Sequence, residues 1–306
     1  MTPDQHTNQE LLLDVGDGHQ IYVQDWGNKD AKTPILFLHG GPGSGNYDND
    51  KERFDPANQH IIFHDQRGSG KSTPKGSIEN NTASHLVDDI EKIAQKLGLD
   101  KFILTGGSWG STLALLYAIA HPERVLGIAI DGVFMATESE ISWLDKGGWS
   151  TFFPDIWQQY QATVPESHQS NPTSYHFKQA FSEDSEKSKK SLYDYSSMEL
   201  ALLKLDQKLT PQPYDDFDTN NSKIEIHYLS NQCFIEGEFI LNNAAKLTMP
   251  VYMVQGRYDM VCPPDAAFRL GQALTNSEII WTINGHVKQH EAKNILNILL
   301  KQLERS

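Results

Sequence analysis

The chain has 306 residues, of which 38% are hydrophobic, 10% aromatic and 22% charged. This composition is typical of a folded globular protein and excludes disordered, collagenous and coiled-coil classes. Forty acidic side chains against 26 Lys and Arg give a net charge of -14. Nucleic acid is therefore disfavoured as a partner, because phosphate backbones are bound mainly through Lys and Arg.

Cysteine content and the N-terminal sequence indicate the compartment. Cys233 and Cys262 are too few for a disulfide framework or a Cys-rich zinc site, and such low usage suits a reducing compartment. Residues 1–10 lack the basic segment and apolar run of a signal peptide. No apolar run approaches the 18 or more residues of a membrane-spanning helix. We therefore expect a soluble cytoplasmic protein with no membrane partner.

Strand-like and helical patterns alternate through the first 130 residues. Short β-rich runs predict strands over 21–26, 34–38, 60–64, 101–105 and 125–130. Apolar residues at three- and four-residue spacing predict helices over 82–97 and 111–120. This alternation predicts right-handed crossovers and a mostly parallel sheet, which is an α/β fold.

The middle of the chain has a different composition. Residues 136–245 contain 17 Asp and Glu, 8 Lys, no Arg and 16 of the 30 aromatic residues. We interpret this segment as an inserted, mostly helical cap with an aromatic and acidic inner surface. The alternative is that its acidic residues only solvate the outside.

The strand and helix pattern then returns, which completes a three-part organisation. Strands are predicted over 250–255 and 278–283, with helices after Pro264 and over 291–303. We therefore expect an α/β core in two parts, 1–135 and 246–306, separated by the cap domain at 136–245.

One segment carries a nucleophile pattern. The sequence Gly-Gly-Ser-Trp-Gly at 106–110 matches G-x-S-x-G, with a predicted strand before it and a helix after it. This context predicts the strained turn of an α/β-hydrolase, with Ser108 as nucleophile. Its oxyanion hole would use the N–H of Trp109 and a second N–H from the loop His-Gly-Gly-Pro-Gly at 39–43, where we assign Gly41.

The acid and the base follow after the cap, in the chain order of this fold. Asp259 comes just after the strand at 250–255, and His286 just after the strand at 278–283. We predict that His286 moves the proton of Ser108 and that Asp259 orients it. Asp265 more naturally caps the next helix and His290 lies on the last one, and no metal motif supports a His pair. We expect neither a metal nor a cofactor.

Six sequence blocks together resemble the prolyl aminopeptidases, or proline iminopeptidases, of the α/β-hydrolase superfamily. They are HGGPG at 39–43, FDP at 54–56, DQRGSGKS at 65–72, GGSWGSTLAL at 106–115, HPER at 121–124 and GRYDMVCP at 256–263. The resemblance implies a helical cap that selects an unblocked N-terminal proline. It also implies that acidic cap residues bind the secondary ammonium group of that proline.

The resemblance places particular residues in the substrate site. Glu199, in Ser-Met-Glu, and Glu225, in Ile-Glu-Ile-His-Tyr, are the implied ammonium ligands, and Gly40 and Tyr228 are further substrate-binding positions. The chain departs from the family in having Ser-Ser-Met before Glu199 instead of tryptophan. It also has Asp131 where the family has arginine.

These observations predict a serine exopeptidase that releases N-terminal proline from small peptides through an acyl-enzyme. One alternative is another hydrolase on the same scaffold: a broader aminopeptidase, an amidase or an esterase. A catalytically silent scaffold that binds a ligand is the other. The sequence does not indicate an oligomeric state.

Overall fold

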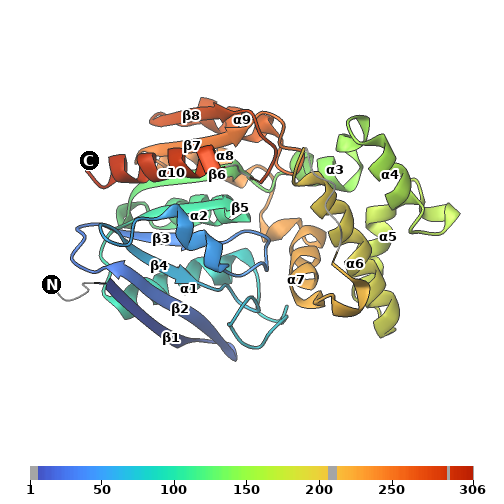
Figure 1. Ribbon diagram of the computed structural model, residues 1–306, viewed down its shortest axis with the longest axis horizontal. Coiled ribbons are helices and arrows are strands. Elements are labelled where there is room, and N and C mark those ends of the chain that lie inside the picture. The colour runs from blue at the N-terminus through green and yellow to red at the C-terminus, as the bar shows by residue number, and fades with distance from the viewer. Residues whose placement is uncertain (1–5, 206–211, 288–289, 306) are drawn as a thin grey trace.

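The computed structural model describes residues 6–205, 212–287 and 290–305, and it contains one eight-stranded sheet (Figure 1). The strand order is β1-β2-β4-β3-β5-β6-β7-β8. The strands are β1 (His6–Gly16), β2 (His19–Asn28), β3 (Pro34–Leu38), β4 (His60–His64), β5 (Phe102–Ser108), β6 (Val125–Val133), β7 (Val251–Gly256) and β8 (Ser277–Thr282). Pairing is antiparallel among β1, β2 and β4 and parallel from β4 to β8.

All seven predicted strands are present, so the predicted mostly parallel α/β fold is confirmed. The edge strand β1 was not predicted. Its sequence starts with the polar run His-Thr-Asn-Gln-Glu, and it pairs with a neighbour on one side only. The apolar part of β1 is confined to its second half, Leu-Leu-Leu-Asp-Val at 11–15, and has no regular alternation, so the pattern did not indicate a strand.

Successive side chains of the central strands enter two different cores, because side chains alternate between the faces of a sheet. Leu36 and Leu38 of β3 pack on the face covered by α1 (Ala83–Leu97), α2 (Trp109–Ala120) and α9 (Pro264–Ala273). Ile35 and Phe37 pack on the other face, against the apolar residues of α10 (His290–Leu303). The sheet is therefore covered on both faces, as parallel sheets generally are.

The cap helices lie between β6 and β7 in the chain. They are α3 (Glu138–Asp145), α4 (Pro154–Gln161), α5 (Pro172–Gln179), α6 (Ser185–Leu202), α7 (Thr219–Ser230) and α8 (Phe239–Asn242). Helices α3 to α7 stand to one side of the sheet, whereas α8 lies back beside it and contacts α2 (Figure 1). The limits 136 and 245 of a separate cap domain stay a prediction.

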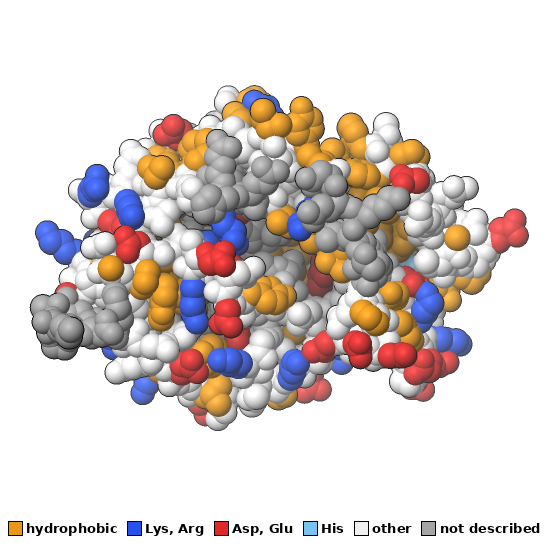
Figure 2. Space-filling view, in the orientation of Figure 1, with side chains coloured by type: hydrophobic (Ala, Val, Ile, Leu, Met, Phe, Trp, Pro, Cys, Tyr) orange, Lys and Arg blue, Asp and Glu red, His pale blue; other side chains and the backbone are white. Residues whose placement is uncertain are grey.

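Most acidic residues of the cap face solvent. Acidic side chains gather along the lower edge of the cap in Figure 2, and exposed examples include Glu183, Asp184 and Glu186. The outer-surface interpretation therefore holds for most of these charges. Only a few acidic groups lie inside, among them Glu140, Asp194 and Glu225.

Across the described residues, no helix combines the length and the apolar character required to cross a bilayer.

Candidate active site

Ser108 lies at the sharp turn where β5 meets α2. Its backbone has φ 56° and ψ -127°, in the positive-φ region that L residues rarely adopt. A Cβ on Gly106 or Gly110 would lie 2.5 Å or 2.1 Å from the carbonyl oxygen of Leu38. The turn therefore accepts only glycine at both positions, which explains the G-x-S-x-G pattern and supports a strained nucleophile turn.

His286 and Asp259 meet at the ends of the last two strands. The distances from His286 Nδ1 to Asp259 Oδ2 and Oδ1 are 2.9 Å and 3.1 Å. Asp259 is 2% exposed, and its Oδ1 accepts the N–H groups of Val261 at 3.0 Å and Cys262 at 2.8 Å. Two backbone N–H groups thus hold this carboxylate in place, and its remaining lone pairs can accept a hydrogen bond from the imidazole.

The thiol of Cys262 contacts both Ser108 and His286. Ser108 Oγ lies 3.8 Å from Cys262 Sγ, and the thiol lies close enough to the imidazole for each group to affect the pKa of the other. Among the hydrogen bonds of the residues that the structure describes, none joins Ser108 Oγ directly to His286. Such nucleophile-to-base contacts are commonly longer in the free enzyme than in the substrate complex.

Burial and charge have opposite effects on the ionisable groups beside Ser108. Burial lowers the pKa of His286, but the charge of Asp259 and its hydrogen bond raise this pKa well above its ordinary value. Burial raises the pKa of the Cys262 thiol, which therefore stays neutral. The arrangement favours an imidazolium at His286, the form that a general base reaches after taking a proton.

The glycine loop after β3 lies directly against Ser108. A Cβ on Gly40 would lie 3.3 Å from the carbonyl oxygen of Gly107 and 3.6 Å from Ser108 Cβ. Gly41 has φ +108° and leaves no room for a side chain beside Gly43. Trp109 is the first residue of α2, and the first N–H groups of a helix have no partner within it. The loop and the helix start thus converge on the same point.

Gln66 links this loop to α2. Its side-chain amide donates to the His39 carbonyl oxygen at 2.9 Å and accepts from Trp109 Nε1 at 2.9 Å. Its backbone N–H donates to His39 Nε2 at 2.9 Å, so the proton of the neutral ring is on Nδ1, which is 2.9 Å from the Gly40 carbonyl oxygen. Burial lowers the pKa of His39, in agreement with a neutral ring. Sequence reasoning missed Gln66, because its role depends on contacts between distant segments.

Replacing Gln66 with alanine should loosen the loop. The change leaves the buried His39 carbonyl oxygen and the Trp109 indole N–H unpaired, at a cost of about 2–4 kcal/mol. We expect a lower melting temperature and a kcat reduced by about 10- to 100-fold, with a smaller change in KM. The exposed Gln95, which pairs with Glu91, supplies the control Gln95→Ala. Equal losses in kcat for both variants would contradict a positioning role for Gln66.

Two cap carboxyl groups meet in the interior. Glu199 on α6 and Glu225 on α7 hydrogen-bond each other, which requires that one of them carries a proton. Burial raises the pKa of Glu225 well above its ordinary value, and the charge of Glu199 raises it further. Burial also raises the pKa of Glu199, while the nearby His286 lowers it. The two carboxyl groups therefore share one proton, and Glu199 lies close enough to His286 for their charges to interact.

Tyr228, also on α7, is completely buried. Its hydroxyl donates to Asn81 Oδ1 at 2.9 Å, and its ring packs against Trp109 with 4.9 Å between ring centroids. This geometry supports the start of α2 from behind. Contact between Tyr228 and a substrate stays a prediction, as it does for Gly40.

His290 lies on the last helix, as predicted, but the prediction that Asp265 caps its helix is wrong, because the N-cap residue of α9 is Pro263 and no side chain caps it. Asp265 lies in the first turn of α9, and His290 is the first residue of α10. Asp265 thus stands at a helix start, where acidic side chains are favoured.

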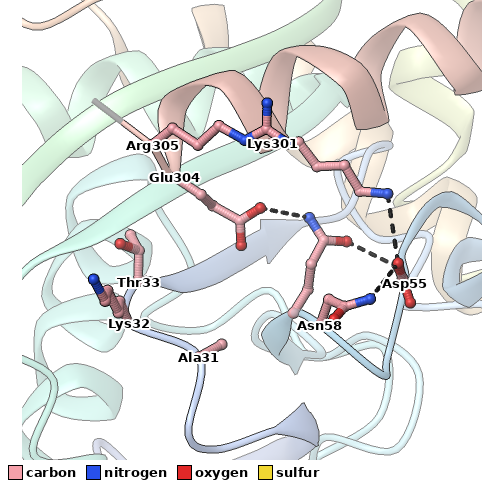
Figure 3. A pocket seen from close by; sticks show the side chains of 9 residues that line it. Ala31, Lys32, Thr33, Asp55, Asn58, Lys301, Glu304 and Arg305 are labelled. Atoms are coloured by element: carbon pink, nitrogen blue, oxygen red, sulfur yellow. Dashed lines mark hydrogen bonds and ion pairs between the residues drawn. The ribbon is translucent and has the colours of Figure 1, made fainter.

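A cavity of about 380 Å³ opens at the other end of the sheet (Figure 3). It is lined by residues just before β3 and at the end of α10, whereas Ser108 is the last residue of the parallel strand β5. Its polar side chains pair with one another: Gln59 with Glu304 at 3.1 Å, and Lys301 with Asp55 at 3.4 Å. This cavity is separate from the candidate active site.

Comparison with known proteins agrees with this geometry. A family model described as alpha/beta hydrolase fold matches residues 33–291. The chain is 38% identical to a protein of Leptolyngbya boryana named "Probable proline iminopeptidase", over 97% of this chain and 94% of that one. It is 37% identical to the proline iminopeptidase of Neisseria gonorrhoeae, over 90% and 89% of the two chains. The chain belongs to the proline iminopeptidase family.

Solved structures place the family within a wider fold. A proline iminopeptidase from Mycobacterium smegmatis superposes with a TM-score of 0.63 at 18% identity, covering 98% of this chain and 99% of that one. An esterase from Exiguobacterium antarcticum superposes with a TM-score of 0.60 at 19% identity, covering 95% of this chain and 97% of that one. At these identities the likeness shows the α/β-hydrolase fold alone, so the substrate has to be argued from the site.

Proposed function

We propose that this protein is a serine exopeptidase that releases unblocked N-terminal proline from small peptides through an acyl-enzyme. The observation that carries the proposal is the pairing of the half-buried Glu199 with the buried Glu225, with Glu199 close enough to His286 for their charges to interact. A carboxyl pair with one negative charge suits a single ammonium group, and the charge interaction of Glu199 with His286 supports an ammonium site close to the reacting carbonyl.

In the proposed reaction, Ser108 Oγ attacks the prolyl carbonyl carbon while His286 takes the hydroxyl proton. Asp259 holds the imidazole and stabilises its protonated form. The bond between the prolyl carbonyl and the leaving nitrogen then breaks, and His286 gives its proton to that nitrogen. Water, deprotonated by His286, next attacks the ester carbon. The bond between that carbon and Ser108 Oγ breaks, His286 returns the proton to Oγ, and proline leaves.

The negative charge that develops on the carbonyl oxygen needs donors. We assign the backbone N–H groups of Gly41 and Trp109 to this task. Each donor in such a site stabilises the transition state by about 3–4 kcal/mol. The contact of the Gly40 loop with Ser108 supports this assignment.

Amine recognition would make the enzyme an exopeptidase. The secondary ammonium of an N-terminal proline has two N–H donors, and each carboxyl group of the pair accepts one in a charge-assisted hydrogen bond. A blocked amine supplies no positive charge and leaves buried carboxyl groups without a partner. We therefore propose discrimination against blocked peptides.

The departures from the family lie around this site. Asp131 is 1% exposed, its Oδ1 lies 3.7 Å from Arg53 Nη1, and its carboxylate lies against Gly107, the residue before Ser108. A negative charge thus replaces a positive one beside the nucleophile turn, with Arg53 as its counter-charge. Met198 before Glu199 is buried, where the family has tryptophan.

The experiment compares a prolyl arylamide with its N-acetyl derivative and with an alanyl arylamide. Cleavage of the free prolyl compound, with little cleavage of the acetylated one, is the expected result. Indifference to the acetyl group would favour an esterase or amidase. A serine-directed phosphonate tests the silent scaffold: folded protein that is not labelled at Ser108 would contradict the proposal.

The pH dependence follows from His286. Because the pKa of His286 is raised by Asp259 in spite of burial, the imidazole stays protonated to a pH above the ordinary histidine value of about 6.5. A protonated imidazole cannot take the Ser108 proton, so kcat/KM should fall as pH decreases through that raised pKa. We expect the midpoint of this acid limb above pH 6.5 in profiles from pH 5 to 10. A midpoint below pH 6 would contradict the assignment.

We also propose that the protein acts in the cytoplasm. Both cysteines are free thiols and both are buried, which suits a reducing compartment. Recovery of the activity in the soluble fraction of broken cells, and not in the medium, tests this.

A further inference from the structure

Tyr195 is a buried side chain whose hydroxyl has no use in the mechanism above. It lies on α6 four residues before Glu199, so that both side chains are on the same face of the helix. Tyr195 is 0% exposed, and its ring packs edge-on against Phe177 with 5.2 Å between centroids. Within the described part of the chain, its hydroxyl has no hydrogen-bond partner.

The surroundings of this hydroxyl are acidic. The pKa of Tyr195 is raised well above its ordinary value, first by burial and then by the charges of Glu225 and Glu199. The phenol is therefore neutral, and its oxygen keeps two lone pairs for a donor. A buried hydroxyl without a partner costs free energy, and a ligand that supplies the missing hydrogen bond regains it.

The number of N–H donors on an ammonium group indicates which ligand would supply the missing hydrogen bond to Tyr195. The secondary ammonium of an N-terminal proline has two N–H groups, which the two carboxyl groups accept. A primary ammonium, as on any other N-terminal residue, has three. The third N–H needs one more acceptor near the carboxyl pair, or it remains unpaired in a buried site at considerable cost.

We propose that the Tyr195 hydroxyl is this third acceptor, so that the enzyme also releases unblocked N-terminal residues other than proline, such as alanine. The inference rests on the proposed function and names a specificity-determining residue for it. The bonds formed and broken are those of proline release, with water as the second reactant. Tyr195 acts only in binding the amine.

The test is the variant Tyr195→Phe, which removes one oxygen atom. We expect kcat/KM for an alanyl arylamide to fall about tenfold, the effect of one lost hydrogen bond to a charged group, while the value for a prolyl arylamide stays within about twofold. Tyr160→Phe is the matched control. Its hydroxyl is also in the cap, but it already bonds Thr173 Oγ1 at 3.3 Å, so both substrates should change by the same factor.

Binding without chemistry gives a second readout. Calorimetry with Ser108→Ala protein measures the dissociation constants of alaninamide and prolinamide, with and without Tyr195→Phe. Weaker binding of alaninamide by about tenfold, with prolinamide unchanged, supports the proposal.

Two results would overturn the inference while the proposed function stands. One is a wild-type enzyme that cleaves the prolyl arylamide but not the alanyl one. The other is an alanyl-to-prolyl ratio that Tyr195→Phe leaves unchanged. A folded wild-type protein that cleaves neither substrate would overturn the proposed function, and this inference with it.

Discussion

Replacement of Ser108 with alanine should lower kcat for a free prolyl arylamide by about 10⁴- to 10⁶-fold. The change removes the atom that forms the acyl-enzyme and leaves only the oxyanion donors and substrate binding, which retain a small residual rate. Steady-state kinetics with the arylamide measures the effect. The backbone at position 108 is already at φ 56°, and alanine should tolerate it about as well as serine, so the fold should persist.

Two controls accompany this variant. Its melting temperature should stay close to that of the wild type, and a serine-directed phosphonate should no longer label it. Ser230→Ala changes an exposed serine at the end of α7 and should leave kcat within twofold. A Ser108→Ala protein that keeps more than a hundredth of wild-type turnover would identify another nucleophile, and Cys262 at 3.8 Å would be the first to replace.

Replacement of Glu225 with glutamine should weaken catalysis and strengthen the fold. The amide keeps the shape of the side chain and, like the protonated carboxyl that it replaces, is neutral, so the negative charge on Glu199 remains. The substrate ammonium keeps the counter-charge of Glu199 but meets an amide where the Glu225 carboxyl was, so kcat/KM for the free prolyl arylamide should fall by about tenfold, the effect of one weakened hydrogen bond to a charged group. The slow cleavage of the N-acetyl compound should change much less.

The gain in stability has a defined pH dependence. The pKa of Glu225 is raised in the folded protein, so the folded state binds a proton more tightly than the unfolded state does. The contribution of this carboxyl to stability is therefore fully present below its unfolded pKa, near 4.3, and is lost as pH rises above that value. Glutamine does not ionise, so the Glu225→Gln variant does not lose this stability as pH rises.

Melting temperatures at several pH values test the sign. The Glu225→Gln variant should melt higher than the wild type near pH 8, and the difference should shrink toward pH 4. Glu278→Gln, at an exposed glutamate on β8, should show no such trend. A Glu225 variant that is less stable than the wild type near pH 8 would contradict the shared-proton arrangement.

The parts of the site that sequence reasoning located are those with local signatures. The turn around Ser108 has its own glycine pattern, and Asp259 and His286 each follow a recognisable strand. In a parallel sheet, residues that follow neighbouring strands meet at one edge, so the contact between Asp259 and His286 could be anticipated.

Other features depend on contacts that no local pattern encodes. Gln66 matters because three segments of the chain meet at its side chain, and Tyr195 because its hydroxyl is buried without a partner. The contact between Cys262 and Ser108 likewise joins loops 154 residues apart. The carboxyl pair was anticipated only from the family resemblance, since Glu199 and Glu225 are two among many acidic residues of the cap.

The insertion of the cap between β6 and β7 separates two tasks along the chain. Ser108 and the glycine loop precede the insertion, Asp259 and His286 follow it, and the carboxyl pair lies within it. On the proposed function, the distance from the carboxyl pair to Ser108 sets how many residues are released, because it fits one residue between the bound ammonium and the bond that is cleaved. Consecutive Cα atoms are about 3.8 Å apart, so a cap placed farther from Ser108 by that distance would lead to release of a dipeptide.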